Sequence, residues 1–225
     1  MAMSTHPLGR HTMKNQLIRM SLFTMMMISL AILVAPGSPS RVHVQEAEAP
    51  ATQTFTLDPV HCMAIFRVQH MGAGQFYGRF NEVAGSFQFD ADSEAGPSFD
   101  VTIATESVDS AHEGLDRTLK SPNFFNAKEY PSLTFKSTSA TKTKDSPETW
   151  DVTGDLTMHG VSRTITVPMT MTGMADKGRG IKCGFEGVFE VNRSDYGMMF
   201  GVNNGSLGDQ VRVIISLEGD LDTEG

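Results

Sequence analysis

The sequence predicts an all-β protein, an extended antiparallel barrel of roughly eight strands with one short helix. From Phe55 onward, apolar and polar residues alternate with a period of two, as in strands that bury one face. The longest such run spans residues 161–172, which at ~3.3 Å per residue make a strand of about 40 Å. Turn-forming residues separate the runs, so that each strand can return alongside the one before it.

One parity of each run is apolar, and we predict that this parity faces the inside of the barrel. In residues 161–172, Ile165, Val167 and Met169 share it, while serine and threonine residues occupy the other parity. The predicted lining of the interior consists of Phe66, Val68, His70, Phe87, Phe89, Val101, Ile103, Phe135, Leu156, Ile165, Val167, Met169, Phe189, Val213 and Ile215. Inward glycines either leave space beside large side chains or mark the bulges that closure needs; they are Gly78, Gly85, Gly154 and Gly187.

Residues 110–131 interrupt the alternation. Their apolar residues recur at roughly helical spacing, which predicts a short helix followed by an irregular apolar stretch. Within that stretch, Phe124 and Phe125 either plug one end of the barrel or form a lid that contacts a ligand. Turn signals bound the other segments at residues 92–97, 144–147, 159–160, 173–180 and 203–208. An eight-stranded barrel has room inside for filling side chains or for one ligand.

The first 35 residues predict a secretory signal peptide. Basic residues precede an apolar run at 20–35 that is shorter than the ~20 residues of a membrane span. We expect cleavage between about residues 36 and 50, a linker over 36–52 and a single barrel domain over 53–221. The mature protein would then be periplasmic or secreted, without stable membrane insertion. A retained N-terminal anchor is the alternative.

The charge balance excludes some partners. Residues 1–50 contain four of the 18 basic and two of the 26 acidic residues, so the rest of the chain has 14 and 24 and a net charge of −10. Binding to nucleic acid depends mainly on neutralising phosphates with basic side chains, so we expect no nucleic-acid partner. The same net charge disfavours adhesion to an anionic membrane surface.

The spacing of histidines argues against a catalytic or metal site. His61 and His70 are nine residues apart, so in a regular strand they point to opposite faces. Cys62 directly follows His61, and adjacent strand residues diverge rather than forming a nucleophile–base pair. We expect structural roles for His61 and His159, a place at the barrel mouth for His70, and neither catalytic residues, metal nor cofactor. A metal held by distant segments is the alternative.

Two cysteines, Cys62 and Cys183, remain after the leader. Each shares the parity of inward residues of its own segment, so we expect both thiols to point into the barrel or its end. A disulfide requires Cα atoms within ~7 Å. Because the two segments are far apart in the sequence and a tunnel lies between opposite walls of the barrel, we expect two buried free thiols, with a disulfide as the alternative.

Four short strings occur in order along the chain. They cover residues 57–70 (LDPVHCMAIFRVQH), 119–125 with 130–135, 154–163 (GDLTMHGVSR) and 192–197 (NRSDYG). Together they resemble the YceI-like family of periplasmic polyisoprenoid-binding proteins over about residues 53–221. The resemblance implies a lipocalin-like barrel with a long apolar tunnel for a polyprenyl chain. The chain departs from the family pattern at Cys62, where serine is usual, and in the helix at Leu115 and Thr118.

These observations together indicate a binding protein that holds a long-chain isoprenoid lipid, either a polyisoprenoid or an isoprenoid quinone. Each buried methylene contributes about 0.8 kcal/mol, so an apolar chain alone can supply most of the affinity. Arg193 and Asp195 either pair locally or reach the lipid headgroup, and residues 198–200 form a flexible entrance or strand core. The alternatives are an enzyme that acts on a small isoprenoid or quinone in the same cavity, and a filled barrel that binds a partner in the cell envelope.

Overall fold

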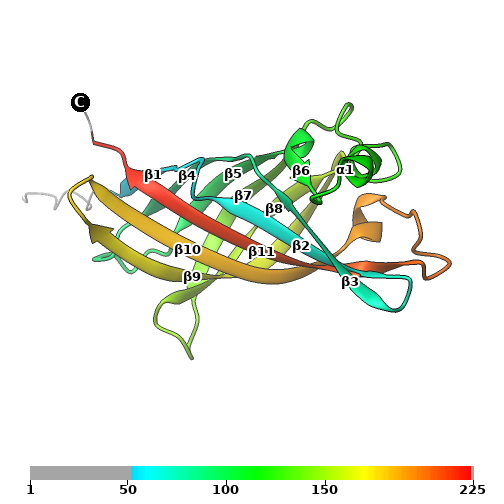
Figure 1. Cartoon of the computed structure of the whole chain (residues 1–225). Helices are drawn as coiled ribbons and strands as arrows, with labels where there is room; N and C mark the ends of the chain where they lie inside the picture. Colours follow the sequence, from blue (N-terminus) through cyan, green and yellow to red (C-terminus); the bar gives the residue numbers. More distant parts are fainter. Residues whose placement is uncertain (1–51, 224–225) are drawn as a thin grey trace, which may run out of the picture. The chain divides into compact units, whose positions relative to one another are not determined.

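The computed structural model describes residues 52–223, and the predicted signal peptide lies outside them. Every paired strand is antiparallel, and the all-β prediction is confirmed. No helix within residues 52–223 is long and apolar enough to cross a membrane. The elements (Figure 1) are β1 Gln53–Leu57, β2 Met63–His70, β3 Gly74–Phe80, β4 Val83–Phe89, β5 Ser98–Ala104, β6 Val108–Asp109, α1 Glu113–Leu119, β7 Ser132–Lys142, β8 Thr149–Met158, β9 Val161–Asp176, β10 Ile181–Asn192 and β11 Leu207–Leu221, with single 3-10 turns at Thr105–Ser107 and Arg193–Tyr196.

Eight strands close the barrel, as predicted. Their order is β1-β4-β5-β7-β8-β9-β10-β11, and β11 pairs again with β1. The edge of β11 that pairs with β1 at one end pairs with β2 along the rest of its length. The strand β2 forms a hairpin with β3, and the two-residue β6 pairs with the end of β3. The β2–β3 hairpin therefore extends the barrel wall, and Figure 1 shows it at the same end of the barrel as α1.

The strand β9 is longer than its sequence indicates. Residues 173–180 carry turn signals, but β9 continues to Asp176. Phe185 of β10 pairs with Met171 and Gly184 pairs with Gly173, which leaves Thr172 as the extra residue of a β-bulge. A glycine inside a strand often marks such a bulge, so Gly173 bends the strand without ending it. The expectation that the turn begins at residue 173 was therefore wrong.

An aromatic core fills one end of the barrel. Phe55, Phe87 and Phe185 are at most 1% exposed. The ring of Phe87 stacks on Phe55 at 5.0 Å and meets Phe185 edge-on at 5.3 Å. Phe89 continues the cluster by an edge contact with Trp150 at 5.5 Å. Aromatic side chains bury large areas and favour such edge-on contacts, so this end is solid rather than hollow.

The helix α1 lies within the segment where the sequence predicts one. His112 is its N-cap, and its Nδ1 accepts a hydrogen bond from the backbone N–H of Leu115 at 3.3 Å. The carboxylate of Asp116 accepts a bond from the backbone N–H of Ser110 at 2.7 Å, which fixes the chain entering the helix. Leu115 and Leu119 face the interior of the barrel, so α1 covers the barrel with its apolar side.

Candidate functional site

The barrel is hollow at the end near α1. A cavity of about 660 Å³ lies there, with an almost entirely apolar wall. This volume is typical of small-molecule sites, which span roughly 300–1,000 Å³. Inward residues on this wall, such as Phe189 and Val213, keep part of their surface accessible, whereas inward residues of the aromatic core are fully buried. The accessible inward surface belongs to a space that side chains leave unfilled.

Most of the predicted lining residues lie on the cavity wall. They are Phe66, Val68, His70, Val101, Ile103, Phe135, Leu156, Ile165, Val167, Met169, Phe189, Val213 and Ile215. Phe87 and Phe89 also face inward, but they belong to the aromatic core at the closed end and do not line the cavity. Their assignment to the lining is corrected. Parity determines which face of a strand is buried, but not the height in the barrel at which a residue lies.

The predicted lining omits the part of the wall that α1 and the loops supply, although Phe124 and Phe125 are expected either to plug one end of the barrel or to contact a ligand as a lid. Phe125 packs edge-on against Phe66 at 5.8 Å and against Phe80 at 5.0 Å, and Phe124 lies 5.3 Å from the ring of Phe200. All five phenylalanines line the cavity. Phe124 and Phe125 thus form part of the cavity wall and would contact whatever occupies it.

The inward glycines differ in what they accommodate. A Cβ atom on Gly78 would collide with the ring of Phe66, and one on Gly187 would collide with the Sδ of Met169. At these two positions the absence of a Cβ atom leaves room for a large side chain of the neighbouring strand. Gly85 has φ +126, and a Cβ there would collide with the backbone of β5. Glycine at this position permits both the positive φ and the close approach of the β5 backbone.

Polar side chains of the wall gather at the open end. They are His70, Gln75, Arg193 and Ser206. Arg193 is only 6% exposed, and its guanidinium donates to four backbone carbonyls: Nε to Gly208 at 2.7 Å, Nη1 to Met198 at 3.2 Å, and Nη2 to Phe200 at 2.8 Å and to Leu207 at 3.4 Å. Burial lowers the pKa of Arg193, and the nearby Asp209 carboxylate opposes that shift. Arg193 therefore braces residues 197–208 through their carbonyls rather than by pairing with Asp195.

A polar network joins the β1–β2 loop to β10 and β11 away from the mouth. Lys182 Nζ lies 3.2 Å from Asp58 Oδ2, 3.3 Å from Glu218 Oε1 and 2.7 Å from Asp220 Oδ1. His61 Nδ1 lies 2.8 Å from Asp58 Oδ2, and this hydrogen bond holds the pKa of Asp58 well below its usual range and raises the pKa of His61. Asp58, His61 and Glu218 are close enough to hold a metal ion. The ammonium group of Lys182 contacts both carboxylates and that of Asp220, so the cluster also ties β10 and β11 to the chain that follows β1.

His159 has the structural role that the sequence predicts. It adopts φ +51 in the β8–β9 turn, and its Nδ1 is 3.1 Å from the carbonyl oxygen of Tyr196. Its ring packs against Tyr130 at 4.9 Å. His159 thus connects the turn to the 3-10 turn that contains Arg193, outside the cavity wall.

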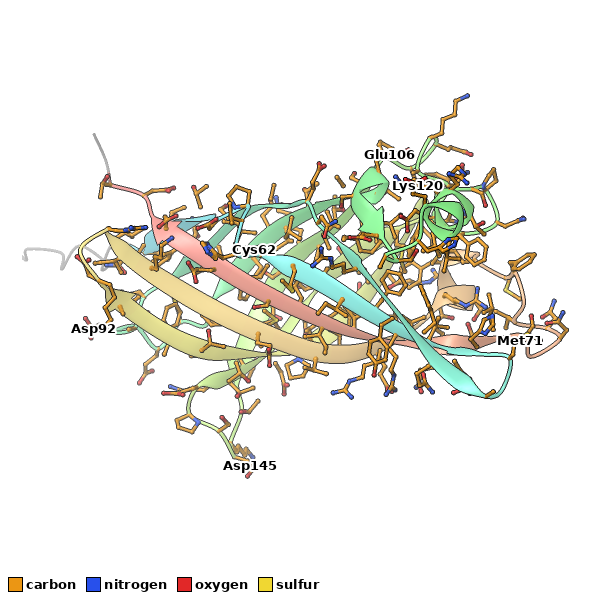
Figure 2. All side chains as sticks on the ribbon, in the orientation of Figure 1. Cys62, Met71, Asp92, Glu106, Lys120 and Asp145 are labelled. Carbon is orange, nitrogen blue, oxygen red and sulfur yellow. The ribbon has the colours of Figure 1, made fainter. Side chains whose placement is uncertain are left out.

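Both cysteines are buried, and neither is in a disulfide (Figure 2 labels Cys62). The Sγ of Cys62 donates to the carbonyl of Glu218 at 3.3 Å and accepts from its N–H at 3.2 Å. Cys183 pairs with the next residue, Gly219, from the opposite edge of β11. The strand β11 therefore runs between the two thiols, and neighbouring strands are ~4.8 Å apart, which makes a bond across two strand spacings too long.

We predict two titratable thiols after denaturation without reductant, and slow reaction of both in the native protein. Burial raises the pKa of Cys183 to about 11 and also raises that of Cys62, so little reactive thiolate forms at neutral pH. Thiol counting with a chromogenic disulfide reagent, before and after adding denaturant, measures both quantities. Absence of titratable thiols and a mass two units lower would contradict this arrangement.

Comparison with known proteins identifies relatives over the barrel. A model of the YceI-like domain family matches residues 55–219. Protein YceI of Escherichia coli O157:H7 is 38% identical over 160 residues, which cover 71% of this chain and 81% of that protein. A UPF0312 protein of Pseudomonas aeruginosa strain UCBPP-PA14 is 36% identical over the same share of each chain.

Solved structures share the fold. BcnA of Burkholderia cenocepacia superposes with a TM-score of 0.63 at 26% identity, over 72% of this chain and 98% of BcnA. The YceI protein of Campylobacter jejuni gives 0.61 at 29% identity, over 69% and 90%. A domain of Saccharophagus degradans described as polyisoprenoid-binding gives 0.55 at 16% identity, over 75% and 98%, and shares the fold alone. The match over residues 55–219 and the identity to YceI proteins show that this chain belongs to the YceI-like family.

Proposed function

We propose that the protein binds and carries a long-chain isoprenoid lipid, a polyisoprenoid or an isoprenoid quinone, in the periplasm or outside the cell. The observation that carries this proposal is the cavity of about 660 Å³, whose wall is apolar from the aromatic core to the mouth. Burial of apolar surface is the main source of affinity in such a site. The Saccharophagus domain of the same fold, described as polyisoprenoid-binding, is consistent with it.

The length of the cavity suits a chain of many carbons. On β11 the wall runs from Leu207 to Leu217, which at ~3.3 Å per residue is about 33 Å along the strand. A strand tilt of ~40° reduces this to roughly 25 Å along the barrel axis. An extended chain advances ~1.2 Å per bond, as three backbone bonds span ~3.5 Å, so about 20 bonds fit in line. A longer lipid would fold back or project from the mouth.

We further propose that the lipid is bound without chemical change. Only two titratable side chains, His70 and Arg193, line the cavity within the described part of the chain. Arg193 is engaged with backbone carbonyls, and His70 is exposed at the mouth. General acid–base catalysis needs a proton donor or acceptor within hydrogen-bond reach of the reacting group. An isoprenoid chain inside this wall would meet hydrocarbon instead.

Mass spectrometry of an organic extract of the exported protein tests this proposal. We expect an isoprenoid lipid at near-stoichiometric amount, and uptake of added polyprenol or isoprenoid quinone by protein from which lipid has been removed. Absence of both bound lipid and uptake would instead support a filled barrel that binds a protein partner. Recovery of the added lipid with an altered mass would support an enzyme.

We predict that Ile103→Trp lowers lipid content severalfold and leaves the free energy of unfolding close to that of the wild type. Ile103 lines the cavity and is only half-buried, so a larger side chain has empty space to occupy. In a filled core the same change would cause overpacking strain, typically ~1–3 kcal/mol. Lipid per protein and urea unfolding measure the two effects. Thr102→Trp, which adds the ring at the adjacent exposed position, is the control and should retain wild-type lipid content.

A further inference from the structure

Exposed apolar side chains surround the cavity mouth. Met71, Met199 and Phe200 are 64%, 43% and 53% exposed. Together with Phe124, which lies 5.3 Å from Phe200, we call them the mouth collar. The backbone N–H of Met71 donates to the carbonyl of Ser206 at 2.8 Å, which ties the tip of the β2–β3 hairpin to the loop that follows Phe200. The mouth collar is thus one connected surface.

The position of Met71 disfavours a purely structural role. It lies at the tip of the β2–β3 hairpin, at the end of the barrel opposite Asp92 (Figure 2). Its φ is +53 and that of Gly72 is +65, the two left-handed residues of a tight hairpin turn. Asparagine or glycine is the usual first residue of such turns, because a larger side chain is strained there. A strained and exposed methionine contributes nothing evident to the fold, and exposed apolar patches commonly mark interaction sites.

Behind the mouth collar, the outer face of the barrel wall formed by β11, β2 and β3 carries two arginines and a tyrosine. Arg67 pairs with Arg212 on one side and with Tyr77 on the other, in one row across β11, β2 and β3. Arg67 is four residues from Met71, about 13 Å along the strand. Neither Arg67 nor Arg212 forms an ion pair with any residue between 52 and 223. Directly opposed like charges are unfavourable, so an anionic partner would relieve this row.

We propose that this end of the barrel docks on the surface of a phospholipid bilayer, with the mouth collar entering the headgroup region. Apolar faces of peripheral proteins enter this region by ~5–10 Å. The row of Arg67, Tyr77 and Arg212 then lies near the level of the phosphates, where arginine and tyrosine are favourable. Arg67 and Arg212 place two positive charges in a row whose next member, Glu190 opposite Arg212, carries one negative charge. This local positive excess favours contact with an anionic bilayer despite the negative net charge of the chain.

Continuity with the cavity identifies a bilayer as the partner. Met71, Phe124 and Phe200 belong both to the mouth collar and to the cavity wall. The inference rests on the proposed function, because a carried lipid must pass between bilayer and cavity, and a docked collar lets it do so without crossing water. A second copy of the chain fits less well, since a two-fold contact through this face would oppose the two arginine rows.

Met199→Glu tests the docking, because Met199 belongs to the collar but does not line the cavity. The probe is flotation of the full exported protein with vesicles of phosphatidylcholine, alone or mixed with phosphatidylglycerol. We expect the wild type to float with both, more strongly with the anionic mixture at low salt. Met199→Glu should reduce the bound fraction by about tenfold or more, since an ionised carboxylate is costly where the apolar collar reaches the boundary between headgroups and acyl chains.

Val60→Glu is the matched control. Val60 is 78% exposed, and its neighbour Asp58 bonds to the backbone of Glu218 at 2.8 Å. Val60 therefore lies about 35 Å along β11 from Leu207. This variant should float as the wild type does. Equal loss of flotation in both variants would overturn a specific role of the collar.

Lipid content, measured in the same samples, separates the two proposals. Wild-type protein that retains lipid but does not float would overturn docking and leave lipid carriage standing. Protein that floats but holds no lipid would overturn lipid carriage. It would also overturn docking as a route for lipid transfer. A third outcome is that the wild type does not bind vesicles but sediments as a dimer, and that Met199→Glu dissociates this dimer. A second copy of the chain would then occupy this surface, and the proposal of bilayer docking would be overturned.

Discussion

Val167→Asp is expected to lower both the free energy of unfolding and the amount of lipid retained, whereas Thr166→Asp leaves both near wild type. Val167 is 3% exposed and lines the cavity. It pairs with Val152, which is fully buried. An unpaired carboxylate in this wall costs on the order of several kcal/mol or becomes protonated. In either form it places a polar group where an isoprenoid chain would lie.

Thr166 provides the control on the same strand. It is exposed and its Oγ1 lies 2.9 Å from the Oγ1 of Thr153 on the outer face, where aspartate remains hydrated. Thermal or urea unfolding and lipid per protein measure the two effects, at pH 7 where an exposed aspartate is ionised. Similar tolerance of both substitutions would show that the register of β9 is not the one described.

Arg193→Lys is expected to destabilise the protein by roughly 2–4 kcal/mol, although the charge is conserved. The guanidinium spreads its donors over the carbonyls of Gly208, Met198 and Phe200. A lysine ammonium is a single point and cannot reach carbonyls spread in this way, so buried and partly buried carbonyls would lose their partners at about 1–3 kcal/mol each. Residues 197–208 should open more readily, and the cavity mouth should loosen with them.

Urea unfolding measures the stability loss, and hydrogen exchange of residues 197–208 locates it. Arg179→Lys, a change at an exposed turn residue, should alter neither quantity. Faster exchange confined to residues 197–208, with faster release of bound lipid, is the signature expected of a mouth brace. Unchanged exchange in Arg193→Lys would show that its carbonyl contacts do not hold the loop.

Much of the barrel wall could be predicted from the alternation of residues. Strand side chains alternate strictly, so a run such as Ile165, Val167 and Met169 has one buried face whatever its neighbours are. The helix also follows from local signals, because the alternation stops at residue 110 and resumes near Leu133. The β-bulge beside Gly173 could not be predicted from the sequence, since a glycine permits either a turn or a bulge and pairing with β10 selects between them.

The sequence by itself determined the inward faces, the antiparallel barrel and the family. Only the tertiary structure decided which inward residues enclose space. Phe87 and Val101 have equivalent patterns in sequence, but Phe87 meets the rings of Phe55 and Phe185, whereas Val101 faces the cavity. Whether inward side chains fill the barrel depends on how many large ones converge at one height. Strand stagger and closure set that height, and periodicity along a single strand carries no information about it.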